Sequence, residues 1–257
     1  ATSDYHALQI QLQRRLARGW QLLAAYTWSH SIDVASNDST PLAPAQRLDP
    51  ETDRGASDFD VRHQLSGALS FEFPTMKAGK IGETLLRGWA MDSIFRAQTA
   101  TPIDVTYARD IGFGFFNARP DLLSGVSAFV PVFLDALNAP GGRQLNPASF
   151  LKPKETRQGS LGRNALRGFP FWQVDFALRR QFELPNRIKL QFRAEAFNLF
   201  NHPNFGDPRA SLSDPLFGQS NSLLNRGLGS GGAGGGLNPV YQVGGPRSIQ
   251  LAIRLAF

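Results

Sequence analysis

The C-terminal segment, residues 247–257, reads RSIQLAIRLAF and alternates strictly between bulky apolar residues and small or polar ones. Residues two apart lie on the same face of a β-strand, so this period of two places every bulky apolar side chain on one face. The segment therefore predicts a strand with one apolar and one polar face. Its last residue, Phe257, is aromatic. A strand of this kind can end a soluble domain or close a β-barrel that crosses a membrane.

Further segments with the same alternation predict strands at residues 5–16, 20–32, 59–73, 87–105, 171–182 and 188–201. The alternation is cleanest between Phe59 and Phe73, where every second residue is apolar except His63 and Gly67. A helix, with about 3.6 residues per turn, would not keep this pattern. No run approaches the roughly 20 consecutive apolar residues of a membrane helix, so any membrane-spanning structure must consist of strands.

The composition excludes several classes of function. The chain has 257 residues, of which 42% are hydrophobic and 19% charged, and its formal net charge is +6. The charges are spread along the chain instead of forming a basic patch, so we do not expect nucleic acid as a partner. There is no cysteine, which excludes a disulfide framework, a cysteine-ligated zinc site and a cysteine nucleophile.

The connections between the predicted strands differ in length in a regular way. Short or moderate ones lie at 17–19, 74–86 and 184–187, and long ones at 33–58, 106–170 and 202–246. Outer-membrane β-barrels have short turns on the periplasmic side and long loops outside. If the C-terminus is periplasmic, all short connections fall on that side and all long ones on the other. We therefore predict an all-β fold, the C-terminal part of an antiparallel up-and-down transmembrane β-barrel with long extracellular loops and about seven strands, open as a fragment.

Aromatic residues near the strand ends support a membrane location. Those predicted at the membrane interfaces are Trp20, Phe71, Trp89 and Phe257 on the periplasmic side and Trp28 and Trp172 on the outer side. Two aromatic belts of this kind are typical of barrels that cross a membrane. The alternative is that these residues fill the core of a soluble β-sandwich that acts as a binding module.

The polar faces of the strands would line the interior of the barrel. The candidates are Gln9, Gln11, Arg62, Gln64, Gln173, Arg179, Lys189, Gln191, Arg193 and Glu195. A ligand site is expected instead in the loops 106–170 and 202–246, because loops on a rigid scaffold carry recognition.

Several stretches of the sequence also resemble a known family. They are RRLARGWQLLAAYTWSHSID (14–33), SDFDVRHQLSGALSFEFP (57–74), LNPASF (145–150), GSLGRNALRGFPFWQVDFALRRQFEL (159–184) and RIKLQFRAEAFNLFNHPNFG (187–206). They resemble the C-terminal barrel of TonB-dependent outer-membrane receptors, above all the Oar-like group. The segment FNLFNHPNFG (197–206) is the most specific of them.

The resemblance implies an integral protein of the bacterial outer membrane that binds a ligand at the cell surface and imports it with energy from the TonB complex. The implied partners are membrane lipid, a plug domain of the same full-length protein that packs on the polar faces, the TonB complex and the barrel-insertion machinery, which would contact the C-terminal strand. The chain begins ATSDYHALQ, without the parts of a signal peptide. We expect residues 1–257 to form one unit, which lacks the signal peptide, the plug and the N-terminal barrel strands.

Catalytic and metal-binding chemistry finds little support in the sequence. His6, His30, His63 and His202 are scattered without metal-ligand spacing. The group Asp58, Asp60 and Arg62 is interpreted as a salt-bridge network that anchors a loop. The glycine run at 227–236 lacks the Lys-Ser/Thr of a phosphate-binding loop. We therefore expect no catalytic, cofactor-binding or metal-binding residues, no cofactor and no enzymatic activity. A surface barrel that adheres to partners without transport is the other alternative.

Overall fold

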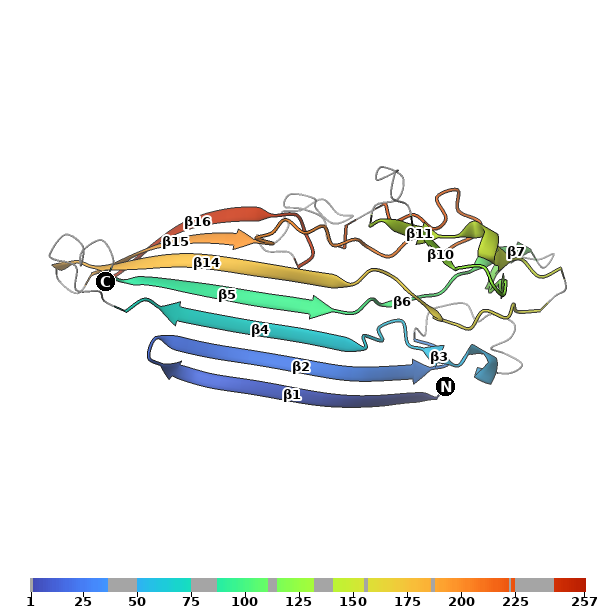
Figure 1. Cartoon of the computed structure of the whole chain (residues 1–257), viewed down its shortest axis with the longest axis horizontal. Helices are drawn as coiled ribbons and strands as arrows, with labels where there is room; N and C mark the ends of the chain where they lie inside the picture. Colours follow the sequence, from blue (N-terminus) through green and yellow to red (C-terminus); the bar gives the residue numbers. More distant parts are fainter. Residues whose placement is uncertain are drawn as a thin grey trace.

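The computed structural model describes residues 2–36, 50–74, 87–110, 115–131, 141–154, 157–185, 188–221, 223–224 and 243–257. Its main feature is one antiparallel sheet in which the long strands pair in chain order (Figure 1). These strands are β1 (Ser3–Ala17), β2 (Trp20–Asp33), β4 (His63–Glu72), β5 (Trp89–Gln98), β14 (Phe171–Glu183), β15 (Lys189–Phe197) and β16 (Ser248–Ala256). A short strand, β3 (Gly55–Ala56), pairs with the end of β2. Within the described residues β1 and β16 do not pair with each other, so the sheet is open.

The strand register follows from the alternation in the sequence. Ala24 lies opposite both Leu12 and Gly67, and Phe95 lies opposite both Gly67 and Val174. Residues directly opposite each other in an antiparallel ladder project to the same face. A single apolar row therefore crosses the sheet from β1 to β14, and the same relation continues through β15 to β16. The predicted all-β fold of antiparallel strands in up-and-down order is confirmed.

The observed strands differ from the predicted ones mainly at their ends. The strand predicted at 59–73 begins only at His63, because the residues before it form a hydrogen-bonded turn. The strand predicted at 188–201 ends before Asn198, whose φ of 50° is incompatible with a strand. The strand predicted at 87–105 is shorter at both ends, and its last residues pair elsewhere.

The region predicted as a long connection, 106–170, contains short strands in its described part, and it forms a small folded unit together with residues 102–103. Its short strands form pairs: β6 (Pro102–Ile103) with β13 (Leu166–Arg167), β7 (Tyr107–Asp110) with β8 (Phe115–Ala118), β9 (Asp121–Leu122) with β12 (Phe150–Leu151), and β10 (Phe129–Pro131) with β11 (Arg143–Leu145). Two short 3-10 helices are η1 (Pro50–Asp53) and η2 (Pro147–Ser149). Among the described residues, no helix is long and apolar enough to cross a membrane.

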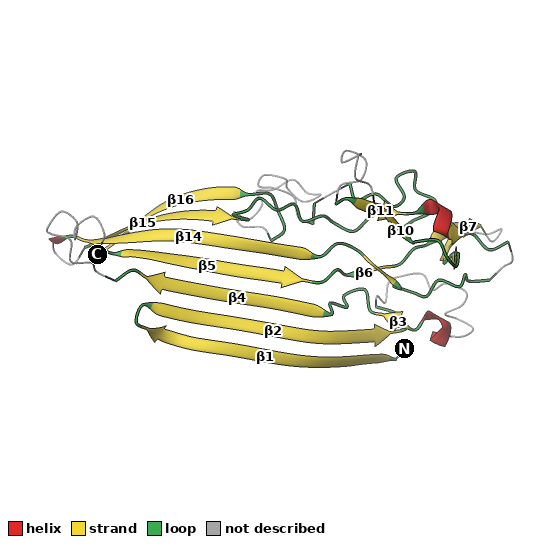
Figure 2. Ribbon diagram, in the orientation of Figure 1, coloured by secondary structure: helices red, strands yellow, loops and turns green. Residues whose placement is uncertain are grey.

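These short strands surround a small hydrophobic core of Ile103, Val105, Leu145, Phe150 and Leu161. The segment 204–221 joins the same structure, since the backbone N–H and C=O of Thr106 bond to Ala210 and Leu212, with N···O distances of 3.0 and 2.8 Å. We call the described residues of 99–170 and 204–221 the cap. It lies at the end of the sheet opposite to the C-terminus (Figure 2). The predicted glycine-rich loop at 227–236 lies outside the described residues.

Candidate functional site

The polar face of the sheet carries a row of alternating charges, which we call the charge row: Glu72, Arg179, Asp92, Arg193 and Glu195. Arg179 Nε lies 3.2 Å from Asp92 Oδ2, and Arg193 Nη1 lies 3.5 Å from the same oxygen. Arg193 Nε donates to Glu195 Oε1 at 2.8 Å. The row arises because β4, β5, β14 and β15 each contribute a charged residue at a polar-face position. It links four strands across the sheet.

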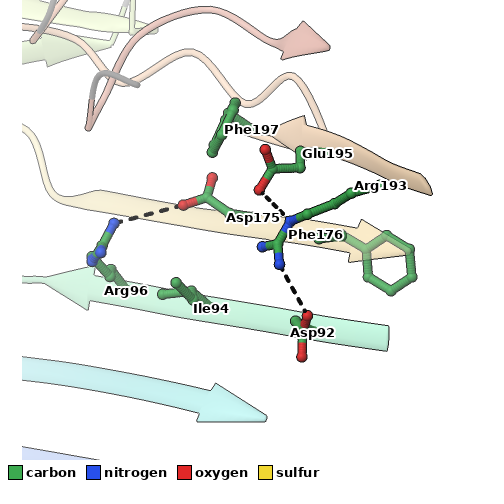
Figure 3. A pocket seen from close by; sticks show the side chains of 9 residues that line it. Asp92, Ile94, Arg96, Asp175, Phe176, Arg193, Glu195 and Phe197 are labelled. Carbon is green, nitrogen blue, oxygen red and sulfur yellow. Dashed lines mark hydrogen bonds and ion pairs between the residues drawn. The ribbon is translucent and has the colours of Figure 1, made fainter. Parts of the chain in front are cut away.

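A hollow of about 150 Å³ is lined in part by the charge row (Figure 3). It is lined by Asp92, Ile94, Arg96, Asp175, Phe176, Ala177, Arg193, Glu195 and Phe197. The guanidinium of Arg96 approaches Asp175 from β5, with Nη1 3.6 Å from Oδ2. Charges of both signs therefore meet at this place, which suits contact with a polar surface that offers both donors and acceptors.

In β14 and β16, the two faces of the sheet are exposed in the reverse of the order usual in soluble proteins. On the apolar face of β16, Ile249, Leu251 and Ile253 are 70%, 78% and 70% exposed. On the polar face of β14, Gln173 and Asp175 are only 0% and 6% exposed. In the described part of the chain, no second sheet packs on the apolar face. An apolar face of this extent requires an apolar environment such as lipid.

The comparison with known proteins agrees with this environment. A family model described as an outer membrane beta barrel domain matches residues 1–229. The chain belongs to this outer-membrane β-barrel family. No curated protein and no solved structure matches it. The chain is therefore an integral outer-membrane β-barrel protein whose apolar face contacts membrane lipid. The soluble β-sandwich considered from the sequence is wrong, because its apolar faces would have to be covered by a second layer.

The structure gives a position to each side chain predicted to line the barrel interior. Those that lie on the polar face of a strand are Gln9, Gln11, Gln64, Gln173, Arg179, Lys189, Gln191, Arg193 and Glu195. Arg62 lies elsewhere, because it precedes β4 and belongs to the turn at the cap end of the barrel. The charge row brings three of them together, namely Arg179, Arg193 and Glu195.

Aromatic side chains gather at both ends of the apolar face. At the end far from the cap, the rings of Trp20 and Phe71 are 4.3 Å apart, and Arg180 lies over Trp89 at 5.2 Å. At the cap end, Trp172 stacks on His202 with ring centroids 4.2 Å apart. Trp28 lies opposite His63 at the same end, and Phe257 is fully exposed at the other.

The segment FNLFNHPNFG forms a compact turn that fastens three strands together. Asn198 is buried, and its Nδ2 donates to the carbonyls of His202 and Gly245 at 2.8 and 2.9 Å. Asn204 Oδ1 accepts from the N–H of Trp172 in β14 at 3.1 Å. Asn201 Oδ1 accepts from the N–H of Arg247, next to β16, at 3.1 Å. The three asparagines thus fix the cap-side ends of β14, β15 and β16 relative to each other.

A buried ion-pair cluster joins the cap to the barrel. Asp60 Oδ2 accepts from Arg62 Nε at 3.0 Å and from Arg167 of the cap, and Arg163 of the cap pairs with Asp33 and Asp58. Burial opposes ionisation of Asp60, but hydrogen bonds from Arg167, Ser31 and His30 outweigh it and lower its pKa to about 2. The predicted loop-anchoring network exists, with Asp60 at its centre, and Asp58 is held by Arg163 instead of Arg62.

Sequence reasoning missed Asp92 and Arg96, which complete the charged part of the polar face. Both lie in β5, where the alternation is weak, so their faces could not be read from the pattern. It also passed over Arg180, which interrupts the apolar row of β14 and lies over the Trp89 and Phe182 rings. Among the described residues, no group of three or more His, Asp or Glu could hold a metal ion.

Proposed function

We propose that this chain forms the C-terminal part of the barrel of an Oar-like, TonB-dependent outer-membrane receptor that binds a ligand and imports it without enzymatic activity. The charge row is the observation that carries the proposal. It crosses four strands of the polar face and presents both guanidinium and carboxylate groups to the interior. A plug domain would find hydrogen-bonding partners of both kinds there.

Exposure of the charge row agrees with a protein partner. The side chains of Arg193 and Glu72 remain 38% and 52% exposed although each is ion-paired. Part of each of these two side chains is therefore accessible to a neighbouring domain. The family resemblance implies a plug at this face, and the TonB complex would act on that plug through the N-terminal region of the full-length protein.

A barrel that adheres to partners without transport is the second candidate. One observation favours it, namely that the cap has its own buried core and short sheets, as a stable recognition platform would. A cap of this kind also suits the ligand-binding loops of a receptor. The two functions are therefore separated by whether a plug domain fills the barrel interior.

Single cysteines test the proposal, because residues 1–257 contain no other and any cysteine elsewhere in the full-length protein can be replaced by serine. In the full-length protein, Gln191→Cys on the polar face should be protected from a water-soluble maleimide and should become reactive when the plug domain alone is deleted. Leu190→Cys, its neighbour on the apolar face, should stay unreactive in both forms, because it faces lipid. The purified full-length protein should also bind the periplasmic domain of TonB. A reactive Gln191→Cys in the intact protein together with no TonB binding would support the adhesion barrel instead.

A further inference from the structure

A second hollow, of about 520 Å³, lies where the cap meets β2. Its lining includes His30 and Ile32 of β2 together with Arg54, Arg62, Arg163 and Arg167. We call it the rim hollow. Four arginine side chains thus line this one open space.

The register places the β2 part of the rim hollow on the lipid-facing side of the sheet. His30 and Ile32 continue the row of Trp28, since residues two apart share a face. Ile32 lies opposite Asp4, and Asp4 is the ion-pair partner of Arg54. The hollow is therefore built in part from the same face of β2 that contacts lipid further along the strand.

The position of the rim hollow along the membrane normal matches the headgroup layer. A strand rises about 3.3 Å per residue, so His30 lies roughly 7 Å along β2 beyond Trp28 of the outer aromatic belt. The polar headgroup region extends roughly 5 to 8 Å beyond the hydrocarbon on each side of a bilayer. The rim hollow thus adjoins the headgroups of the outer leaflet, beside the barrel.

Two of its arginines keep donors available for a ligand. Arg163 and Arg167 are engaged with buried carboxylates, those of Asp33 and Asp60. Arg54 and Arg62 are 36% and 39% exposed in their side chains, and Arg54 donates from Nη1 to Thr2 and from Nη2 to Asp4. Arg62 uses Nε on Asp60 and Nη2 on His30, and its Nη1 bonds to no other described residue. His30 is itself held by Asp60, with Nδ1 3.2 Å from Oδ1, so the Arg62 side chain is fixed at the hollow.

We propose that the rim hollow binds a phosphate group of an outer-leaflet glycolipid, the phosphorylated headgroup of lipopolysaccharide. Guanidinium groups bind phosphate through paired N–H donors, and Arg54 and Arg62 approach the hollow from two separate elements. The carboxylates around them hold the guanidinium groups in place, which lowers the entropic cost of ordering them around a ligand. The site depends on the membrane location of the barrel and is independent of transport.

The test uses the full-length protein, purified in detergent and stripped of lipid. Lipopolysaccharide, its enzymatically dephosphorylated form and inorganic phosphate are titrated separately, and binding is followed by fluorescence and by native mass spectrometry. Lipopolysaccharide should bind, the dephosphorylated form should bind about tenfold more weakly, and inorganic phosphate should neither bind detectably nor compete. Equal binding of both lipid forms would overturn the proposal, and so would binding of inorganic phosphate with no preference for the lipid.

Substitutions locate the site. Arg54→Gln combined with Arg62→Gln should weaken lipopolysaccharide binding about tenfold. The matched control is Arg14→Gln, because Arg14 lies opposite Leu22 on the lipid-facing side, at the other end of the barrel. This control should bind as the unchanged protein does. If the double variant does not fold, Arg62→Gln alone serves, since Arg167 still holds Asp60. Unchanged binding by the folded double variant, or by folded Arg62→Gln where the double variant does not fold, would place the lipid elsewhere and overturn the proposal.

Discussion

Arg167 in the cap donates a hydrogen bond to the carboxylate of Asp60, which lies 107 residues earlier in the chain. Arg167 Nη1 also donates to the backbone carbonyl of Asp60 at 2.7 Å, and Asp60 Oδ1 accepts from the N–H of Ser31 in β2 at 2.7 Å. The Asp60 side chain is fully buried. One carboxylate therefore fastens the cap to β2 and to the turn before β4, so its removal should affect the whole outer end of the barrel.

Asp60→Asn should lower the free energy of unfolding of the full-length barrel by about 3 kcal/mol, because it removes the buried charged acceptor that the guanidinium groups of Arg62 and Arg167 share. Unfolding by urea in phospholipid vesicles, followed by tryptophan fluorescence, measures the change. Asp121→Asn is the control, since Asp121 pairs with Arg157 at a more exposed place in the cap. Equal losses for both variants would show that Asp60 does not have the anchoring role that its contacts indicate.

The Asp60 carboxyl also predicts acid sensitivity. Its pKa in the folded protein is about 2, against an ordinary value of 3.8, because hydrogen bonds from Arg167, Ser31 and His30 outweigh the opposing effect of burial. The folded state thus binds this proton less readily than the unfolded state does. The stabilisation is fully present above about pH 4 and should be lost as the pH falls towards about 2. Unfolding free energies measured across this range should decline less steeply for Asp60→Asn than for the unchanged protein.

The strands could be predicted from the sequence because each is long enough to show its period of two, and because lipid on one face enforces that period. Predictions failed where this constraint ends. The residues from Phe59 to Arg62 continue the alternation of β4, yet they form a turn, because the Asp60 side chain accepts hydrogen bonds from Arg167 of the cap as well as from Ser31 of β2. No local pattern could reveal this, since the partner lies in a distant part of the chain.

The cap escaped prediction for a related reason. Its strands are two to four residues long, and contacts such as Thr106 with Leu212 join segments from different loops. Segments this short carry no readable period. The candidate lumen side chains were easier to place, because a position within a strand determines its face. Asp92 and Arg96 were the exceptions. Near them the polar Ser93 faces lipid and the apolar Ile94 faces the interior, the reverse of the usual alternation.

Depth in the membrane should determine the cost of a charge on the apolar face. Between Trp28 and Trp20, the middle of the apolar face is at Gly67, and Leu69 is the next residue of β4 on that face. Leu190 instead lies near the start of β15. Leu69→Arg should impair membrane assembly by about 2 to 4 kcal/mol, and Leu190→Arg should cost clearly less. Folding titrations of the full-length protein into vesicles measure both.

Ser70→Arg provides the control for that series. Ser70 is adjacent to Leu69 in sequence but projects to the polar face, where its hydroxyl donates to Asp92 at 2.6 Å. An arginine there would lie in the polar interior beside Asp92, which Arg179 and Arg193 already contact, so assembly should be impaired less than by Leu69→Arg. If Ser70→Arg were as harmful as Leu69→Arg, the assignment of the two faces would be wrong.

The last prediction concerns the asparagines that follow β15. Asn198→Ala removes the two hydrogen bonds that Nδ2 donates to His202 and Gly245 and the one that Oδ1 accepts from His202 N–H at 3.0 Å. Because Asn198 is 1% exposed, water cannot replace these bonds. We expect the free energy of unfolding of the full-length barrel to fall by about 3 kcal/mol.

Asn201→Ala separates this effect from backbone strain. Asn198 and Asn201 have nearly the same left-handed backbone, with φ of 50° and 51°, so alanine meets a similar conformational penalty at both positions. Asn201 is exposed and accepts a single bond, from the N–H of Arg247. Urea unfolding should therefore show a smaller loss for Asn201→Ala. Equal losses would mean that asparagine is needed at Asn198 for its backbone conformation, and that the buried bonds to Gly245 do not hold β16 in register with β15.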